Sequence, residues 1–311
     1  MQYFLQQLIN GLSVGSIYAL IAVGYTMVYG VLQLINFAHG DVFMVGAVVA
    51  LVAARTFGFV TPAGVTESWL AFALVAFCSI LACGLLGFAI ERLAYRPLRD
   101  KPRINSLITA VGISLLLEFG GQHRAVFGPT PQPFPFQMVP GIRQPLFSVG
   151  DVVVNRVDAL ILFVTVALML GLTYVVLRTK AGLGLRAVSY RFDTAALMGV
   201  NIDRTISFTF VLGSVLAAVA GVLFVVKYPK VEPLMGLLPG IKAFIAAVFG
   251  GIGNIAGAVA GAMIIGLVEV MVVGYVENGS QYRDAIAFVL LIAILLIKPS
   301  GLFGKHVVEK V

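Results

Sequence analysis

Residues 178–204, RTKAGLGLRAVSYRFDTAALMGVNIDR, form a basic, polar segment between two long apolar runs. The segment is too long for a turn, and four of its residues recur at i, i+3, i+4 and i+7, on one face of a helix: Phe192, Ala195, Ala196 and Gly199. Gly199 suits the left-handed backbone that ends such a helix, and Asn201 can cap the next one. The pattern predicts a short surface helix whose apolar face meets something outside the bilayer. An ordinary loop held by lipid phosphates is the alternative.

The composition around this segment is that of a membrane protein. Hydrophobic residues make up 60% of the 311 residues, charged residues 11%, and the mean hydropathy is +1.02. A soluble domain has roughly 45–50% apolar and about 25% charged residues. Since one span needs about 20 apolar residues, the chain has room for about eight or nine spans and no separate soluble domain. We therefore expect an all-α, polytopic integral membrane helical bundle, with residues 1–311 as one domain.

The basic residues predict how the bundle is oriented. The formal net charge is +7, but the charges gather at span ends, where they set topology and do not indicate nucleic-acid binding. The loop at 91–103 and the segment at 178–204 together hold ten of the 21 Lys and Arg residues, which places both in the cytoplasm. Counting back puts the amino terminus outside. Three lysines in apolar surroundings weaken the rule locally: Lys227, Lys230 and Lys242.

Two interruptions of the apolar pattern predict broken or re-entrant helices. The first is GVLQLINFAHGD, residues 30–41, where Asn36, His39 and Asp41 are polar. Irregular polar backbone survives at membrane depth only where protein or a water-filled cavity covers it. The segment is therefore either a re-entrant element near a translocation path or a tight turn at the membrane surface.

The second interruption lies within residues 241–270, where Gly250, Gly251 and Gly253 break an apolar run. Gly253, Gly257 and Gly261 then form a GxxxGxxxG face. Half-helices that meet at such a break build midplane sites in many transporters. Close packing of two full helices is the alternative.

Ionisable residues inside spans are functional candidates by default. Glu118 lies near the end of its span, which favours an interfacial, structural role, and Glu269 lies further along the glycine-rich helix. Between the spans, residues 122–156 hold six of the 13 prolines, a spacing that forbids helix and favours an extended external segment. This segment is a covering loop or a docking edge for an external partner.

The sequence carries no pattern for catalysis, metal or nucleotide binding. It has no GxxxxGK[ST] motif for ATP. Its three histidines match no zinc spacing, and no nucleophile–base pair can be argued from spacing. We expect a transport protein, not an enzyme, with no metal and no cofactor of its own.

Four stretches resemble bacterial ABC permeases for branched-chain amino acids, of the Liv type. RAVSYRFDTAALMGVNIDRTISFTFVLGSVLAAVAGVL resembles their coupling-loop region, and AVFGGIGNIAGAVAGAMIIGLVE their GGIGS-type signature. INFAHGDVFMVGA resembles the early NFAHG segment, and KPSGLFGK the PTG-type ending. One departure is Ser189-Tyr190-Arg191, where the family more usually has an acidic stretch.

The resemblance implies a permease that pairs with a second homologous permease above two cytoplasmic ATP-binding subunits, in the bacterial inner membrane. A periplasmic substrate-binding protein would deliver leucine, isoleucine or valine. The segment 178–204 would be the coupling loop, whose ATPase contacts we assign to Phe192, Asp193, Ala195, Ala196, Leu197, Met198, Gly199 and Arg204.

We assign the translocation path to Asn36, His39, Gly251, Gly253, Asn254 and Glu269. ATP itself would be bound by the partner subunits. A urea or amide permease of the same superfamily, or another amino-acid permease, is the main alternative. An ion-coupled secondary transporter is a weaker one, because only Glu118 and Glu269 offer buried carboxylates.

Overall fold

The computed structural model describes residues 1–61, 64–99, 101–124 and 126–304. Within these ranges eight helices are long and apolar enough to cross a membrane, and a ninth apolar helix is shorter. The predicted polytopic helical bundle is therefore confirmed. The long helices are α1 (Gln2–Leu32), α2 (His39–Thr56), α3 (Trp69–Ile90), α4 (Arg103–Gln122), α5 (Arg156–Arg178), α8 (Ile202–Lys227), α10 (Ile255–Tyr275) and α11 (Arg283–Ile297). The short helix is α9 (Leu237–Gly250).

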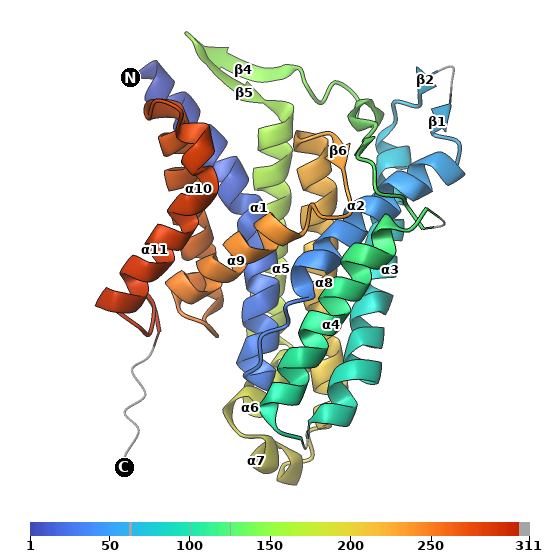
Figure 1. Cartoon of the computed structure of the whole chain (residues 1–311), viewed down its shortest axis with the longest axis vertical. Helices are drawn as coiled ribbons and strands as arrows, with labels where there is room; N and C mark the ends of the chain where they lie inside the picture. Colours follow the sequence, from blue (N-terminus) through green and yellow to red (C-terminus); the bar gives the residue numbers. More distant parts are fainter. Residues whose placement is uncertain (62–63, 100, 125, 305–311) are drawn as a thin grey trace.

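The helices are arranged around α1, which runs through the bundle with α8 and α10 beside it (Figure 1). The α3–α4 pair lies on one side and the α10–α11 pair on the other (Figure 1). The amino terminus and the segment 178–204 lie at opposite ends of the molecule. We call the end with residues 91–103 and 178–204 the basic end. The tail lysines Lys305 and Lys310 lie outside the described residues.

Small residues let the central helices approach backbone to backbone. A Cβ placed on Gly15 of α1 would lie 2.9 Å from the Cα of Met263 on α10. One placed on Gly221 of α8 would lie 2.3 Å from the carbonyl oxygen of Phe43 on α2. Because lipid offers apolar contacts as good as leucine does, such close packing is a main source of helix association in a membrane. The small-residue stripes in the sequence are thus the helix contacts.

The end opposite the basic end is covered by short strands. β1 (Val60–Thr61) pairs with β2 (Gly64–Val65), β3 (Gln132–Pro133) with β6 (Lys230–Val231), and β4 (Pro145–Val149) with β5 (Val152–Asn155), all antiparallel. The described part of the proline-rich stretch has no α-helix after Gln122, only a 3₁₀ turn, η3 (Phe136–Met138). The extended structure predicted there is confirmed.

The basic end is more helical than the sequence suggested. Residues 91–98, part of the predicted loop, continue α3 through a π-helical turn, η1 (Glu91–Tyr95), and a 3₁₀ turn, η2 (Arg96–Leu98). A second pair of helices, α6 (Lys180–Tyr190) and α7 (Phe192–Leu197), forms the segment 178–204. Glu91 is buried and accepts hydrogen bonds from Arg99 and from Ser207 of α8. A buried carboxylate here requires such partners, which explains why the loop is ordered.

Candidate functional site

The segment 33–38 returns into the bundle after α1 ends, so that α2 begins among other helices. His39 is buried between α1 and α8: its Nε2 would lie 2.2 Å from a Cβ on Gly24, and its Cε1 3.5 Å from a Cβ on Gly213. Its ring also packs edge-on against Tyr25, with centroids 4.7 Å apart. His39 at the start of α2 is thus buried among other helices, and the choice between a re-entrant element and a turn at the membrane surface stays a prediction.

The polar groups of this segment are held by other helices. Tyr95 donates a hydrogen bond of 3.1 Å to the side-chain oxygen of Asn36. Ser114 of α4 donates one of 2.5 Å to Asp41, whose carboxyl group also neighbours that of Glu118. Glu118 is buried there, and its expected interfacial, structural role stays a prediction. Asn36 and His39 thus have clear packing roles, and their place on a translocation path stays a prediction.

The glycine break joins α9 to α10 as a tight hairpin. A Cβ on Gly250 would lie 1.9 Å from the carbonyl oxygen of Gly257, so the two helices touch through their backbones. Gly251 and Gly253 have φ values of +105° and +92°, which side chains rarely adopt. The side chain of Asn254 then caps α10 by accepting from the Gly257 N–H at 3.1 Å. The two interpretations of the glycine break are each partly right. α9 is too short to be a full span, as a half-helix would be, and it packs closely against α10.

The chain's final described residues cover this break. The Leu302 N–H donates to the Phe249 carbonyl at 2.9 Å, and the Phe303 N–H to the Gly250 carbonyl at 3.0 Å. In the other direction, the side-chain amide of Asn254 donates a hydrogen bond of 3.2 Å to the Phe303 carbonyl. The carbonyl groups at the end of α9 are thereby satisfied, as the end of a helix requires.

The break does not lie at mid-depth, and this part of the prediction is corrected. A Cβ on Gly30, in the last turn of α1, would lie 3.8 Å from the Cα of Gly253. Gly253 also shares a cavity with Arg186 and Ser189 of α6. The break therefore lies at the basic end, because α9 starts inside the bundle and runs only to that end.

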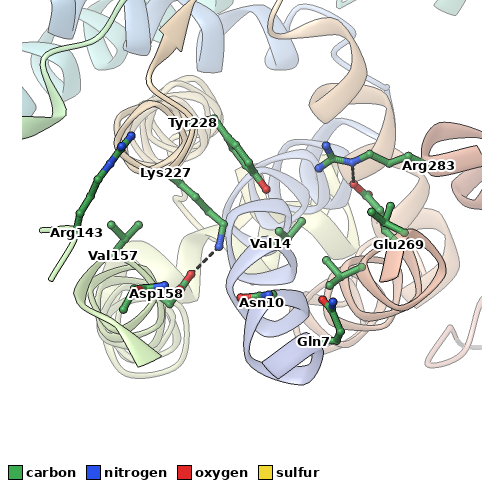
Figure 2. A pocket seen from close by; sticks show the side chains of 13 residues that line it. Gln7, Asn10, Val14, Arg143, Val157, Asp158, Lys227, Tyr228, Glu269 and Arg283 are labelled. Carbon is green, nitrogen blue, oxygen red and sulfur yellow. Dashed lines mark hydrogen bonds and ion pairs between the residues drawn. The ribbon is translucent and has the colours of Figure 1, made fainter. Parts of the chain in front are cut away.

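A charged pocket of about 520 Å³ opens toward the opposite end, between α1, α5, α8 and α10 (Figure 2). Its floor is one face of α1, with Gln7, Asn10 and Val14 spaced three and four residues apart. On one side, the Lys227 ammonium donates a hydrogen bond of 2.6 Å to Asp158 and another of 2.8 Å to the Ser13 hydroxyl. The other wall carries the Arg283–Glu269 pair (Figure 2).

Glu269 is the centre of the second wall. It is 1% exposed, and its carboxylate accepts hydrogen bonds from Arg283, from Lys242 at 3.1 Å and from the Tyr18 hydroxyl at 3.1 Å. Lys242 also lies 2.6 Å from Asp284. A carboxylate at this depth is tolerated because cations and a hydroxyl surround it.

The sequence analysis identified Glu269 but missed its partners, and it missed Asp158. The lysines that weakened the positive-inside rule were the feature of the sequence that could have indicated these ion pairs. Lys227 and Lys242 lie away from the basic end because each is neutralised by a buried carboxylate. A lysine that violates the charge rule thus indicates an ion pair.

The pocket presents both signs of charge around an apolar strip. Val14, Val157, Val270 and Val273 line it between the two ion pairs. Arg143 is a further cation of the pocket; in the described part of the chain it stacks on the Phe136 ring, 3.7 Å from the centroid, and has no carboxylate partner. Such an arrangement can orient a small zwitterion that carries an apolar side chain.

At the basic end, α7 presents an exposed apolar tip. Leu197 and Met198 are 87% and 80% exposed, and Gly199 then ends the helix with φ +81°, as predicted. The Asn201 side chain caps α8 by accepting from the Arg204 N–H at 2.9 Å, also as predicted.

The predicted contact face is corrected at one position. Ala195 is 3% exposed and packs against the chain itself, because a six-residue helix turns one side to α6 and α8. The other proposed contact residues are exposed: Phe192, Asp193, Ala196, Leu197, Met198, Gly199 and Arg204. Their role in coupling stays a prediction.

Apolar helices of membrane-spanning length, buried ion pairs beside an apolar strip and a protruding helix indicate a multi-pass membrane transport protein. The chain belongs to the family described as branched-chain amino acid transport system / permease component, whose model matches residues 7–295. It is 42% identical to the high-affinity branched-chain amino acid transport system permease protein BraD of Pseudomonas aeruginosa, over 99% of this chain and 98% of that one. It is 40% identical to LivH of Salmonella typhimurium, with the same coverage. A probable LivH permease of Methanocaldococcus jannaschii is 28% identical over 92% of this chain and 88% of that one.

Proposed function

We propose that this chain is the permease subunit of an ATP-driven importer for branched-chain amino acids in a bacterial inner membrane. Its relatives at 40–42% identity are named high-affinity permeases for these solutes. The ATP is bound by two cytoplasmic partner subunits, which accords with the absence of a P-loop motif from the sequence. A second, homologous permease and an external binding protein complete the assembly.

The observation that carries the proposed substrate is the charged pocket of Figure 2. A branched-chain amino acid has a carboxylate, an ammonium group and a short apolar side chain. Arg143 offers the carboxylate an uncommitted cation. Asp158, whose Oδ1 is paired with Lys227, is the carboxylate that we assign to the ammonium group. Val14 and its neighbours face the apolar part. The solute enters from the side of β4 and β5, which the charge pattern places outside the cell.

The coupling step is assigned to α7. Leu197 and Met198 protrude into the cytoplasm at the carboxyl end of α7, where Gly199 ends the helix and the Asn201 cap starts α8. An apolar pair of this kind, rimmed by polar residues, is typical of a protein-docking surface. Movement of the ATP-binding subunits then reaches α6 and α8 through the buried Ala195 side of α7.

Uptake of labelled leucine by cells that lack their own system tests the substrate assignment. We expect Asp158→Asn to lower uptake at least about tenfold at limiting leucine, since the pocket then loses its counter-charge for the ammonium group. Asp151→Asn, in the exposed turn between β4 and β5, is the matched control and should not change uptake. Equal uptake by both variants at equal membrane level contradicts the assigned pocket, and uptake of urea in place of leucine contradicts the substrate.

A further inference from the structure

A second polar cavity lies at the basic end, where nothing in the proposed transport cycle uses it. It has a volume of about 760 Å³ and is enclosed by the end of α1, by η2, by the start of α4, and by α6 and α7. Five basic and two acidic side chains line it, the basic ones being Arg96, Arg99, Lys101, Arg103 and Arg191. The cavity therefore has an excess of positive charge.

The five cations divide into two groups. Arg96 and Arg99 both bind Asp203, and Arg99 also binds Glu91, so these two are neutralised and held in place. Lys101, Arg103 and Arg191 have no acidic partner within the described ranges of the chain. Three uncommitted cations that converge on a cavity favour an anion with several acceptor oxygens, such as a phosphate group.

The surroundings of the cavity indicate what carries the phosphate. α4 begins at Arg103, and from there a stripe of exposed apolar side chains runs along the helix at helical spacing: Ile104, Ile108, Val111 and Leu115. The cationic end of this stripe lies at the level where the basic segments meet the membrane surface. A ligand with a phosphate at one end and a long apolar chain at the other matches both features.

We propose that this cavity binds the headgroup of an anionic phospholipid of the inner leaflet, with an acyl chain along the exposed stripe of α4. Lys101 and Arg103 bind the phosphate from the side of α4, and Arg191 binds it from the side of α7. The proposal does not depend on which solute is transported.

The site has a consequence for coupling, because it shares residues with the docking helix. Arg191 and Phe192, which open α7, line the cavity. A bound headgroup therefore holds the start of α7 against the start of α4.

Native mass spectrometry of the detergent-purified complex, titrated with phosphatidylglycerol or phosphatidylcholine, tests the site. We expect phosphatidylglycerol to bind preferentially, and the double variant Lys101→Gln, Arg103→Gln to bind it at least about tenfold more weakly, since each juxtamembrane cation contributes about a fivefold factor. Lys180→Gln removes one basic-end charge outside the cavity and should bind like the wild type. Unfolding temperatures of all variants confirm that they are folded.

Three results would overturn the proposal. One is equal phosphatidylglycerol binding by the double variant and the wild type. Another is displacement of the lipid by equimolar glycerol 1-phosphate, which would assign the cavity to a soluble phosphate. The third is loss of the ATP-binding subunits from the double variant in lipid-free detergent, which would assign these cations to a protein contact.

Discussion

Lys242 of α9 and Glu269 of α10 form an ion pair, with Nζ 3.1 Å from Oε2, in a part of the bundle that water barely reaches. Their side chains are 5% and 1% exposed. The same carboxylate accepts from Tyr18 of α1 and from Arg283 at the start of α11. Four helices therefore meet at one buried charge, and its removal deprives Lys242 and Arg283 of their shared buried carboxylate.

Glu269→Gln is expected to destabilise the protein by about 3–5 kcal/mol, because Lys242 and Arg283 lose their shared buried carboxylate and Lys242 keeps only the half-exposed Asp284 as a partner. The unfolding temperature in detergent measures this loss. Glu232→Gln is the control, since Glu232 pairs with Lys230 at the surface, where such a pair contributes at most about 1 kcal/mol. If the two variants unfold alike, the buried network does not stabilise the bundle.

Adding Lys242→Met to Glu269→Gln should recover part of the lost stability, because the buried cation that has lost its buried partner is then removed. The double variant is compared with Glu269→Gln under the same conditions. A further loss on adding Lys242→Met would mean that Lys242 contributes mainly through Asp284.

Gly261→Ala tests the close contact of α9 with α10. The added Cβ would lie 2.3 Å from the carbonyl oxygen of Ala246, so the helices must separate. A cost of about 1–3 kcal/mol is expected, as for other overpacked sites. Gly112→Ala in α4 is the matched control, because nothing lies within 4 Å of its Cβ, and it should be neutral or stabilising.

Leu302→Pro tests whether the carboxyl-terminal segment holds the glycine break. Proline removes the N–H that binds the Phe249 carbonyl at 2.9 Å, whereas Leu302→Ala keeps it. We expect faster proteolysis near residues 250–254 in the proline variant only. Identical cleavage of the two variants would show that this hydrogen bond does not hold the break.

The double variant Leu197→Asp, Met198→Asp should lose the ATP-binding subunits on purification, because the tip of α7 becomes charged. Leu183→Asp, on the exposed side of α6, is the control for charge in the same segment. Retention of the subunits by the double variant at wild-type amounts places the docking surface elsewhere.

The sequence was sufficient to predict the elements whose causes are local. Apolar run length predicts the spans, the spacing of Gly253, Gly257 and Gly261 predicts the close contact of α9 with α10, and Gly199 and Asn201 predict the end of α7 and the start of α8. Each of these follows from a few neighbouring residues and from general helix chemistry.

The charged pocket could not be predicted, because its members are far apart in the chain. Asp158 and Lys227 are 69 residues apart, and the pocket residue Glu269 is 27 residues from Lys242, the partner that it binds outside the pocket lining. The prediction that the glycine break lies at mid-depth was wrong for a related reason. A sequence shows that α9 is short, but only its packing beside Gly30 shows at which end of the bundle it stops.

The energy source of leucine accumulation tests the central claim most directly. The intact complex and the Leu197→Asp, Met198→Asp variant would be reconstituted into vesicles with the external binding protein and labelled leucine. We predict that leucine accumulation requires ATP on the cytoplasmic side, does not depend on a proton gradient and is lost in the variant. Accumulation driven by a proton gradient without ATP, equal in both proteins, would contradict the account and make Glu118 and Glu269 the residues to test as proton carriers.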